Sequence, residues 1–92
     1  MTIHVKDFVY GHITISEAED ENARIFKDDN GNMMKVRIGD SLIVCSGSSC
    51  QKWIGDGVVD RFNDMGDPNR FLLDNTSFHV GTCAYIGILA NN

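Results

Sequence analysis

An Asn-Gly pair between two β-rich runs is the feature that most constrains what this chain can fold into. In the segment "ARIFKDDNGNMMKVRI", residues 23–38, β-forming side chains lie on both sides of Asn30 and Gly31. A two-residue type I′ turn requires positive φ at both central positions, which asparagine and glycine tolerate. The sequence therefore predicts an antiparallel β-hairpin that turns at these two residues.

The position of the turn decides which hairpin residues face each other. With Asn30 and Gly31 as the turn, Ile25 lies opposite Val36 and the apolar positions share one face. A bulged turn would set Ile25 against Lys35, which matches the apolar pattern less well. We therefore expect the first of these two registers.

In the expected register, the other face of the hairpin is rich in cations. One interpretation is that they only keep a sheet face soluble while Phe26 closes over the edge of the core. The other is a contact face for a phosphate backbone or an acidic protein surface, with stacking on Phe26. Together with the tip, the candidate partner-binding residues are Arg24, Phe26, Asp28, Asp29, Asn30, Asn32, Lys35 and Arg37.

The remaining segments predict an α+β fold. "TIHVKDFVYGHITIS" is typical of a bent strand or of two strands broken at Gly11, "LIVC" of a central strand, and "RFLLD" and "GTCAYIGIL" of two more. Apolar residues at helical offsets predict a short helix from Val58 to Met65, and "SEAEDENA" predicts at most one or two exposed helical turns. We expect a single small domain over residues 1–92, with an antiparallel sheet of four to six strands and one short helix.

Charge and length narrow the classes of function. A net charge of −5, with the acidic excess in "SEAEDENAR", argues against stable binding to duplex DNA, which needs many contacts from Lys and Arg to phosphates. The start "MTIHVKDF" lacks the pattern of a signal peptide, and the longest apolar run is too short to span a bilayer. We expect a cytosolic protein without a membrane segment, whose three cysteines stay reduced.

No catalytic constellation is apparent. Cys50 with His79 downstream lacks the residues that surround a papain-like nucleophile. The Gly/Ser run "SGSSCQK" lacks the spacing of a P-loop, and the carboxylates form no obvious catalytic pair. We expect a protein that is not an enzyme and has no cofactor, although the Gly/Ser run leaves a nucleotide-sequestering protein as an alternative.

A second alternative is a small zinc-binding module. Cys45 and Cys50 are separated by four residues, and His79 and Cys83 by three, so the two pairs could supply one tetrahedral site. Cys45 and Cys83 also occupy apolar strand positions, where a free cysteine behaves as a small hydrophobe. We therefore expect no metal.

From "MTIHVKDFVYGHITISEAEDENARIF" through "DDNGNMMKVRIGDSLIVCSGSSC" to "AYIGILANN", the chain resembles the small phage-encoded anti-CRISPR proteins directed against type I-F surveillance complexes. The resemblance lies in length, charge and the general run of the sequence, and these inhibitors share neither a fold nor a signature motif. It therefore assigns no role to a numbered residue.

The resemblance implies a stoichiometric inhibitor in the host cytoplasm. Its partners would be Cas proteins of a type I-F complex, together with the CRISPR RNA that they hold, and it would block the binding or hybridisation of target DNA. Such complexes hold nucleic acid in a positively charged channel. The acidic stretch around residues 17–21 would suit the protein walls of that channel, and the cationic hairpin face would suit the RNA.

Overall fold

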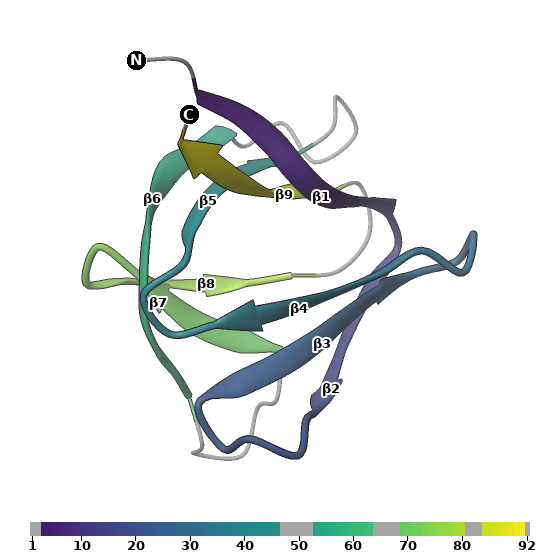
Figure 1. The fold of residues 1–92 in the computed structure, drawn as a ribbon, viewed down its shortest axis with the longest axis horizontal. Helices are drawn as coiled ribbons and strands as arrows, with labels where there is room; N and C mark the ends of the chain where they lie inside the picture. Colours follow the sequence, from purple (N-terminus) through teal and green to yellow (C-terminus); the bar gives the residue numbers. More distant parts are fainter. Residues whose placement is uncertain (1–2, 47–52, 64–68, 81–83, 92) are drawn as a thin grey trace.

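The computed structural model describes residues 3–46, 53–63, 69–80 and 84–91, which fold into strands and the turns between them (Figure 1). The strands are β1 (Ile3–Gly11), β2 (Ile13–Glu17), β3 (Ala23–Asp28), β4 (Met33–Arg37), β5 (Ser41–Ser46), β6 (Trp53–Phe62), β7 (Arg70–Leu73), β8 (Thr76–His79) and β9 (Ala84–Asn91). One antiparallel sheet has six strands in the order β1-β9-β5-β6-β7-β8, and a second has three in the order β2-β3-β4. In the described residues, the protein is an all-β domain.

The predicted α+β class is wrong, because the described residues contain no helix. The helix expected over Val58–Met65 begins inside β6, where Val59 and Phe62 are buried and Val58 is exposed. A bulge in the pairing with β7, between Val59 and Arg61, sets two apolar side chains three residues apart on the same side of the strand. That spacing imitates a helical period. Met65, the expected end of that helix, lies outside the described residues. Within the described part of the chain, no helix is long and apolar enough to cross a membrane.

Most of the predicted strands are confirmed. The chain breaks between β1 and β2 at Gly11, whose φ is +102°. The "LIVC" strand is β5, between β9 and β6, and β9 is also a central strand, between β1 and β5. The sequence did not predict β8 or the division into two sheets. Residues 18–22, expected to form at most one or two helical turns, instead form the bend and turn between β2 and β3.

One core lies between the two sheets and joins them. Phe26 of β3 and Phe71 of β7 are fully buried, and their ring centroids are 5.7 Å apart. Buried apolar side chains of β1, β5, β6 and β9 belong to the same cluster, and each contributes on the order of 2 kcal/mol by leaving water. The link from β4 to β5 is anchored on β6, because the N–H of Gly39 donates to the carbonyl of Val59 at 2.8 Å. Together with the shared core, this bond fixes the three-stranded sheet against the six-stranded one.

Candidate functional site

The β3–β4 hairpin closes through a three-residue loop. The N–H of Asp28 donates to the carbonyl of Asn32 at 3.0 Å, and the N–H of Gly31 donates to the carbonyl of Asp28 at 3.2 Å. Gly31 has a φ of +86°, whereas Asn30 is not among the described residues with positive φ. A type I turn followed by a glycine bulge has this geometry. The predicted two-residue turn, and the register derived from it, are therefore wrong by one residue.

This shift exchanges the faces of β4 relative to β3, because side chains alternate along a strand. Ile25 faces Lys35, and Lys27 faces Met33. The cations of β4 therefore lie on the same face as Lys27. We define the basic face as Lys27, Lys35 and Arg37, on the outer side of the three-stranded sheet.

All three residues of the basic face reach solvent. Lys27 and Arg37 are exposed and Lys35 is half-buried. Met33 lies among them with 63% of its surface exposed. In the described part of the chain, no carboxylate forms an ion pair with these three cations. In a protein with a net charge of −5, such a cluster provides a local attraction for anions.

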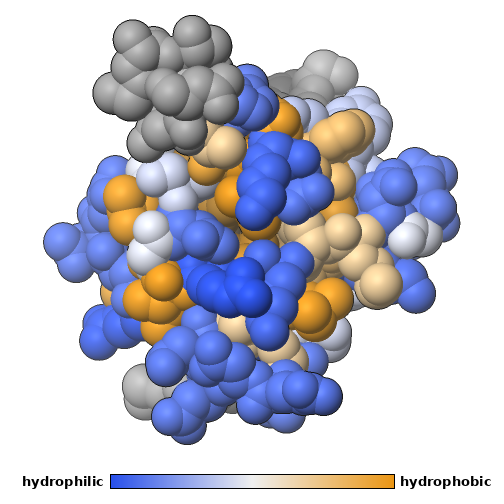
Figure 2. All heavy atoms as spheres, viewed as in Figure 1, coloured by the Kyte–Doolittle hydropathy of each residue, from blue (hydrophilic) through white to orange (hydrophobic). Residues whose placement is uncertain are grey.

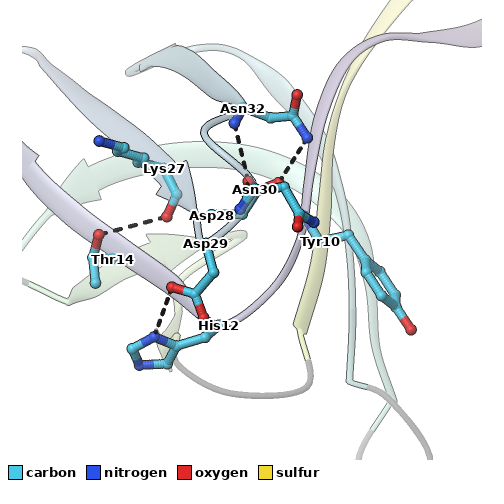
Figure 3. Close-up of polar contacts among 8 residues, drawn as sticks. All are labelled: Tyr10, His12, Thr14, Lys27, Asp28, Asp29, Asn30 and Asn32. Carbon is cyan, nitrogen blue, oxygen red and sulfur yellow. Dashed lines mark hydrogen bonds and ion pairs between the residues drawn. The ribbon is translucent and has the colours of Figure 1, made fainter.

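Asp28 builds the tip of the hairpin (Figure 3). Its side chain is only 3% exposed and accepts hydrogen bonds from the N–H groups of Asn30 (2.9 Å) and Asn32 (3.0 Å), from Nδ2 of Asn32 (3.1 Å) and from the N–H of Tyr10 (3.2 Å). Desolvation raises the pKa of this carboxyl, but the hydrogen bonds from Asn32, Tyr10 and Asn30 outweigh it and hold the pKa below its usual range. Asp28 is thus a structural residue that joins the hairpin to β1.

Three other predicted partner-binding residues do lie at the exposed tip: Asp29, Asn30 and Asn32. The tip projects from the body of the fold at the right of Figure 2 as a mostly hydrophilic protrusion. Nδ1 of His12 lies 3.4 Å from Oδ1 of Asp29, and both side chains are largely exposed. The tip and the basic face belong to one hairpin, so a flat or grooved partner could contact both.

Arg24 and Phe26 lie away from the basic face. Phe26 is fully buried. The Cζ atom of Arg24 lies 4.9 Å from the ring centroid of Phe62, and its Nη1 donates to the carbonyls of Glu21 (2.9 Å) and Ala23 (2.7 Å). Arg24 therefore holds the acidic β2–β3 turn on the body of the protein.

The predicted alternative metal ligands are only partly covered by the structure. Cys45 lies in β5 and His79 in β8, so β6 and β7 separate their strands within the sheet. Cys50 and Cys83 lie outside the described residues. Among the residues that are described, no three His, Cys, Asp or Glu side chains gather as they would around a metal ion.

An aromatic group on the six-stranded sheet was missed by the sequence reasoning. Phe8 and Tyr10 of β1 are 49% and 59% exposed. The Phe8 ring is stacked on Tyr85 of β9 with centroids 5.6 Å apart, and Tyr10 meets Tyr85 edge-on at 6.5 Å. We call these three residues the aromatic patch. The alternation of Phe8 and Tyr10 along the strand is a local signal that could have indicated a shared face, but their partner Tyr85 is apparent only from the pairing of β1 with β9.

Comparison of the chain with protein-family models, with curated proteins and with solved structures finds no match in any of the three.

Proposed function

We propose that this protein is a phage anti-defence protein that acts in the host cytoplasm as a stoichiometric inhibitor of a type I-F CRISPR surveillance complex. The class of partner is taken from the resemblance of the whole chain to such inhibitors. In this proposal the protein binds the assembly of Cas proteins and CRISPR RNA, catalyses no reaction, and prevents target DNA from binding or hybridising.

The basic face is the observation that supports this proposal best. Lys27 and Lys35 lie diagonally across the β3–β4 pair, and Arg37 follows Lys35 on the same face, so neighbouring cations are about 7 Å apart at the backbone. A row of cations on a sheet suits the phosphates of a guide RNA. At the tip, Asp29 suits the cationic protein that surrounds this RNA.

The test is a competition for target DNA on a purified type I-F surveillance complex. Wild-type protein is expected to prevent binding of labelled target DNA at a ratio near one inhibitor to one complex. The double substitution K27E/R37E is expected to weaken this inhibition at least about tenfold, because two contacts to anions become repulsive. Both side chains are exposed, so the variant should melt like the wild type.

A matched control separates the location of the charge from its amount. R61E/R70E changes two exposed cations on β6 and β7, outside the three-stranded sheet and away from β1, and shifts the net charge by the same amount. We expect it to inhibit within about threefold of the wild type, as rim charges away from a contact do. If wild-type protein does not bind the complex, the proposed class is wrong; if the two variants inhibit equally well, the basic face is not the contact.

A further inference from the structure

The aromatic patch belongs to a larger apolar surface on the outer side of the six-stranded sheet. Phe8 pairs with Gly87, Gly87 with Ile43, and Ile43 with Asp56, so these four residues form one row across β1, β9, β5 and β6. A Cβ atom on Gly87 would lie only 3.0 Å from Cγ1 of Val5 and 3.3 Å from Cγ2 of Ile43. The absence of a side chain at Gly87 therefore lets the neighbouring apolar side chains approach each other.

The aromatic patch and its neighbour Val5 leave apolar surface exposed to water. Phe8, Tyr10 and Val5 are 49%, 59% and 37% exposed. Exposed aromatic side chains on a rigid element are the residues that most often dominate binding at protein interfaces, because they supply much contact area at a small entropic cost. The three rings are held by a sheet, so little further ordering would be needed on binding.

The charge of the side chains around the aromatic patch indicates which kind of partner could bind there. In the row that begins at Phe8, the one ionisable side chain is the exposed Asp56. The Tyr10–Tyr85 pair faces Cys45 of β5 and brings no cation. A nucleic acid strand would place phosphates against Asp56 with no cation in the row to hold them. A second copy docked through this same surface would bring the same carboxylate and no complement, and in the proposed function its basic face is engaged with the RNA.

We propose that the aromatic patch and Asp56 form a docking surface for a basic protein surface that presents an arginine beside apolar side chains. A guanidinium can stack on the exposed rings, and a second cation about three strand spacings away, roughly 14 Å, would meet Asp56. This inference rests on the proposed function: the basic protein surface is a Cas subunit of the same complex, bound on a different face from the one that meets the RNA.

The test uses purified surveillance complex and photocrosslinking from defined positions. The photoreactive residue p-benzoylphenylalanine is placed at Tyr10 and, as a control, at Ser77, which is exposed on β8 at the opposite edge of the same sheet. The Tyr10 probe is expected to link to a Cas protein, in a product that survives ribonuclease, and the Ser77 probe is not. In parallel, Y10A, F8A and D56K are each expected to weaken binding about tenfold or more, and S77A by less than about twofold.

Each outcome separates the two proposals. If wild-type protein does not bind the complex, the proposed function fails and this inference fails with it. Wild-type protein that binds while the Tyr10 probe links only to RNA, or only to a second copy, would refute the docking surface and leave the proposed function standing. The same conclusion would follow if the probe links to nothing and the three variants bind normally. Circular dichroism and melting temperatures show whether the variants are folded, which the exposure of these side chains leads us to expect.

Discussion

At the scale of single residues, the carboxylate of Asp28 couples its ionisation to the shape of the hairpin tip. Its oxygens accept four hydrogen bonds from three residues on two segments of the chain. An asparagine in its place would point an amide N–H₂ group at donors of Asn32 and Tyr10, and buried donors without an acceptor are costly. This side chain therefore positions the predicted contact residues without touching a partner.

We expect Asp28→Asn to lower the melting temperature by several degrees at neutral pH, and D29N, which removes the same charge from the exposed neighbour, to change it little. The native pKa of Asp28 lies below that of an unfolded aspartate, about 3.9, so the folded protein holds this proton less tightly than the unfolded chain. The stabilisation is thus present above about pH 4 and is lost as the pH falls through the lowered pKa. Thermal melts from pH 7 to pH 2 check this: the gap between wild type and D28N should narrow towards acid, and a constant gap would contradict it.

At the scale of elements, two hairpins of this chain illustrate two different turns. Between β7 and β8, Asp74 and Asn75 have φ values of +50° and +66°, and Leu73 pairs with Thr76. This is the two-residue turn with positive φ at both positions that the sequence predicted for Asn30 and Gly31. The β3–β4 loop instead has positive φ only at Gly31 among its residues.

The two turn types predict opposite responses to the same substitution. We expect Asn75→Gly to be neutral or stabilising, because glycine adopts positive φ at no steric cost. Asn30→Gly should lower the free energy of unfolding by about 0.5–1 kcal/mol, since it adds flexibility at a position that does not need it. Urea unfolding of both variants provides the comparison. If N30G instead proves more stable than the wild type, the three-residue loop is contradicted and the two-residue turn with its register is favoured.

These two hairpins also show which parts of the fold the sequence could predict. Strands were predictable from β-rich runs bounded by turn residues, as for β5, β7 and β9. The register of β3 and β4 was not, because it depends on backbone N–H groups reaching the side chain of Asp28. The false helix arose from the bulge before Arg61, which gives Val59 and Phe62 a helical spacing.

The candidate site was predictable to a similar extent. Lys35 and Arg37 were placed among the contact residues, and the structure leaves both on an outer face. The register expected from the sequence leaves out Lys27 and includes Arg24, because the register decides which residues of β3 share a face with Lys35 and Arg37. Tyr85 joins Phe8 through pairing of the first and last strands, and no local pattern carries that information.

At the scale of the whole molecule, the charge is segregated between surfaces. The chain carries a net charge of −5, yet the outer face of the three-stranded sheet has three cations without an ion pair among the described residues. The outer face of the six-stranded sheet has the aromatic patch and Asp56. Both surfaces are turned outward from the one core that the two sheets share, and they come together at β1, where the N–H of Tyr10 donates to Asp28. Each surface can meet a different component of the proposed partner.

This segregation predicts how binding depends on salt. If Lys27, Lys35 and Arg37 each contact a phosphate of the guide RNA, the logarithm of the association constant should fall with the logarithm of salt concentration with a slope of about −2, since each contact to a single strand contributes about −0.7. K27E/R37E removes two contacts and should bring the slope to about −0.7 or closer to zero, whereas R61E/R70E should keep the wild-type slope. Titrations of labelled protein into purified complex, from about 50 to 300 mM salt, measure all three slopes. A K27E/R37E variant that binds weakly but keeps the full slope would mean that its cations meet carboxylates or apolar surface of a protein, and that the RNA is not what the basic face contacts.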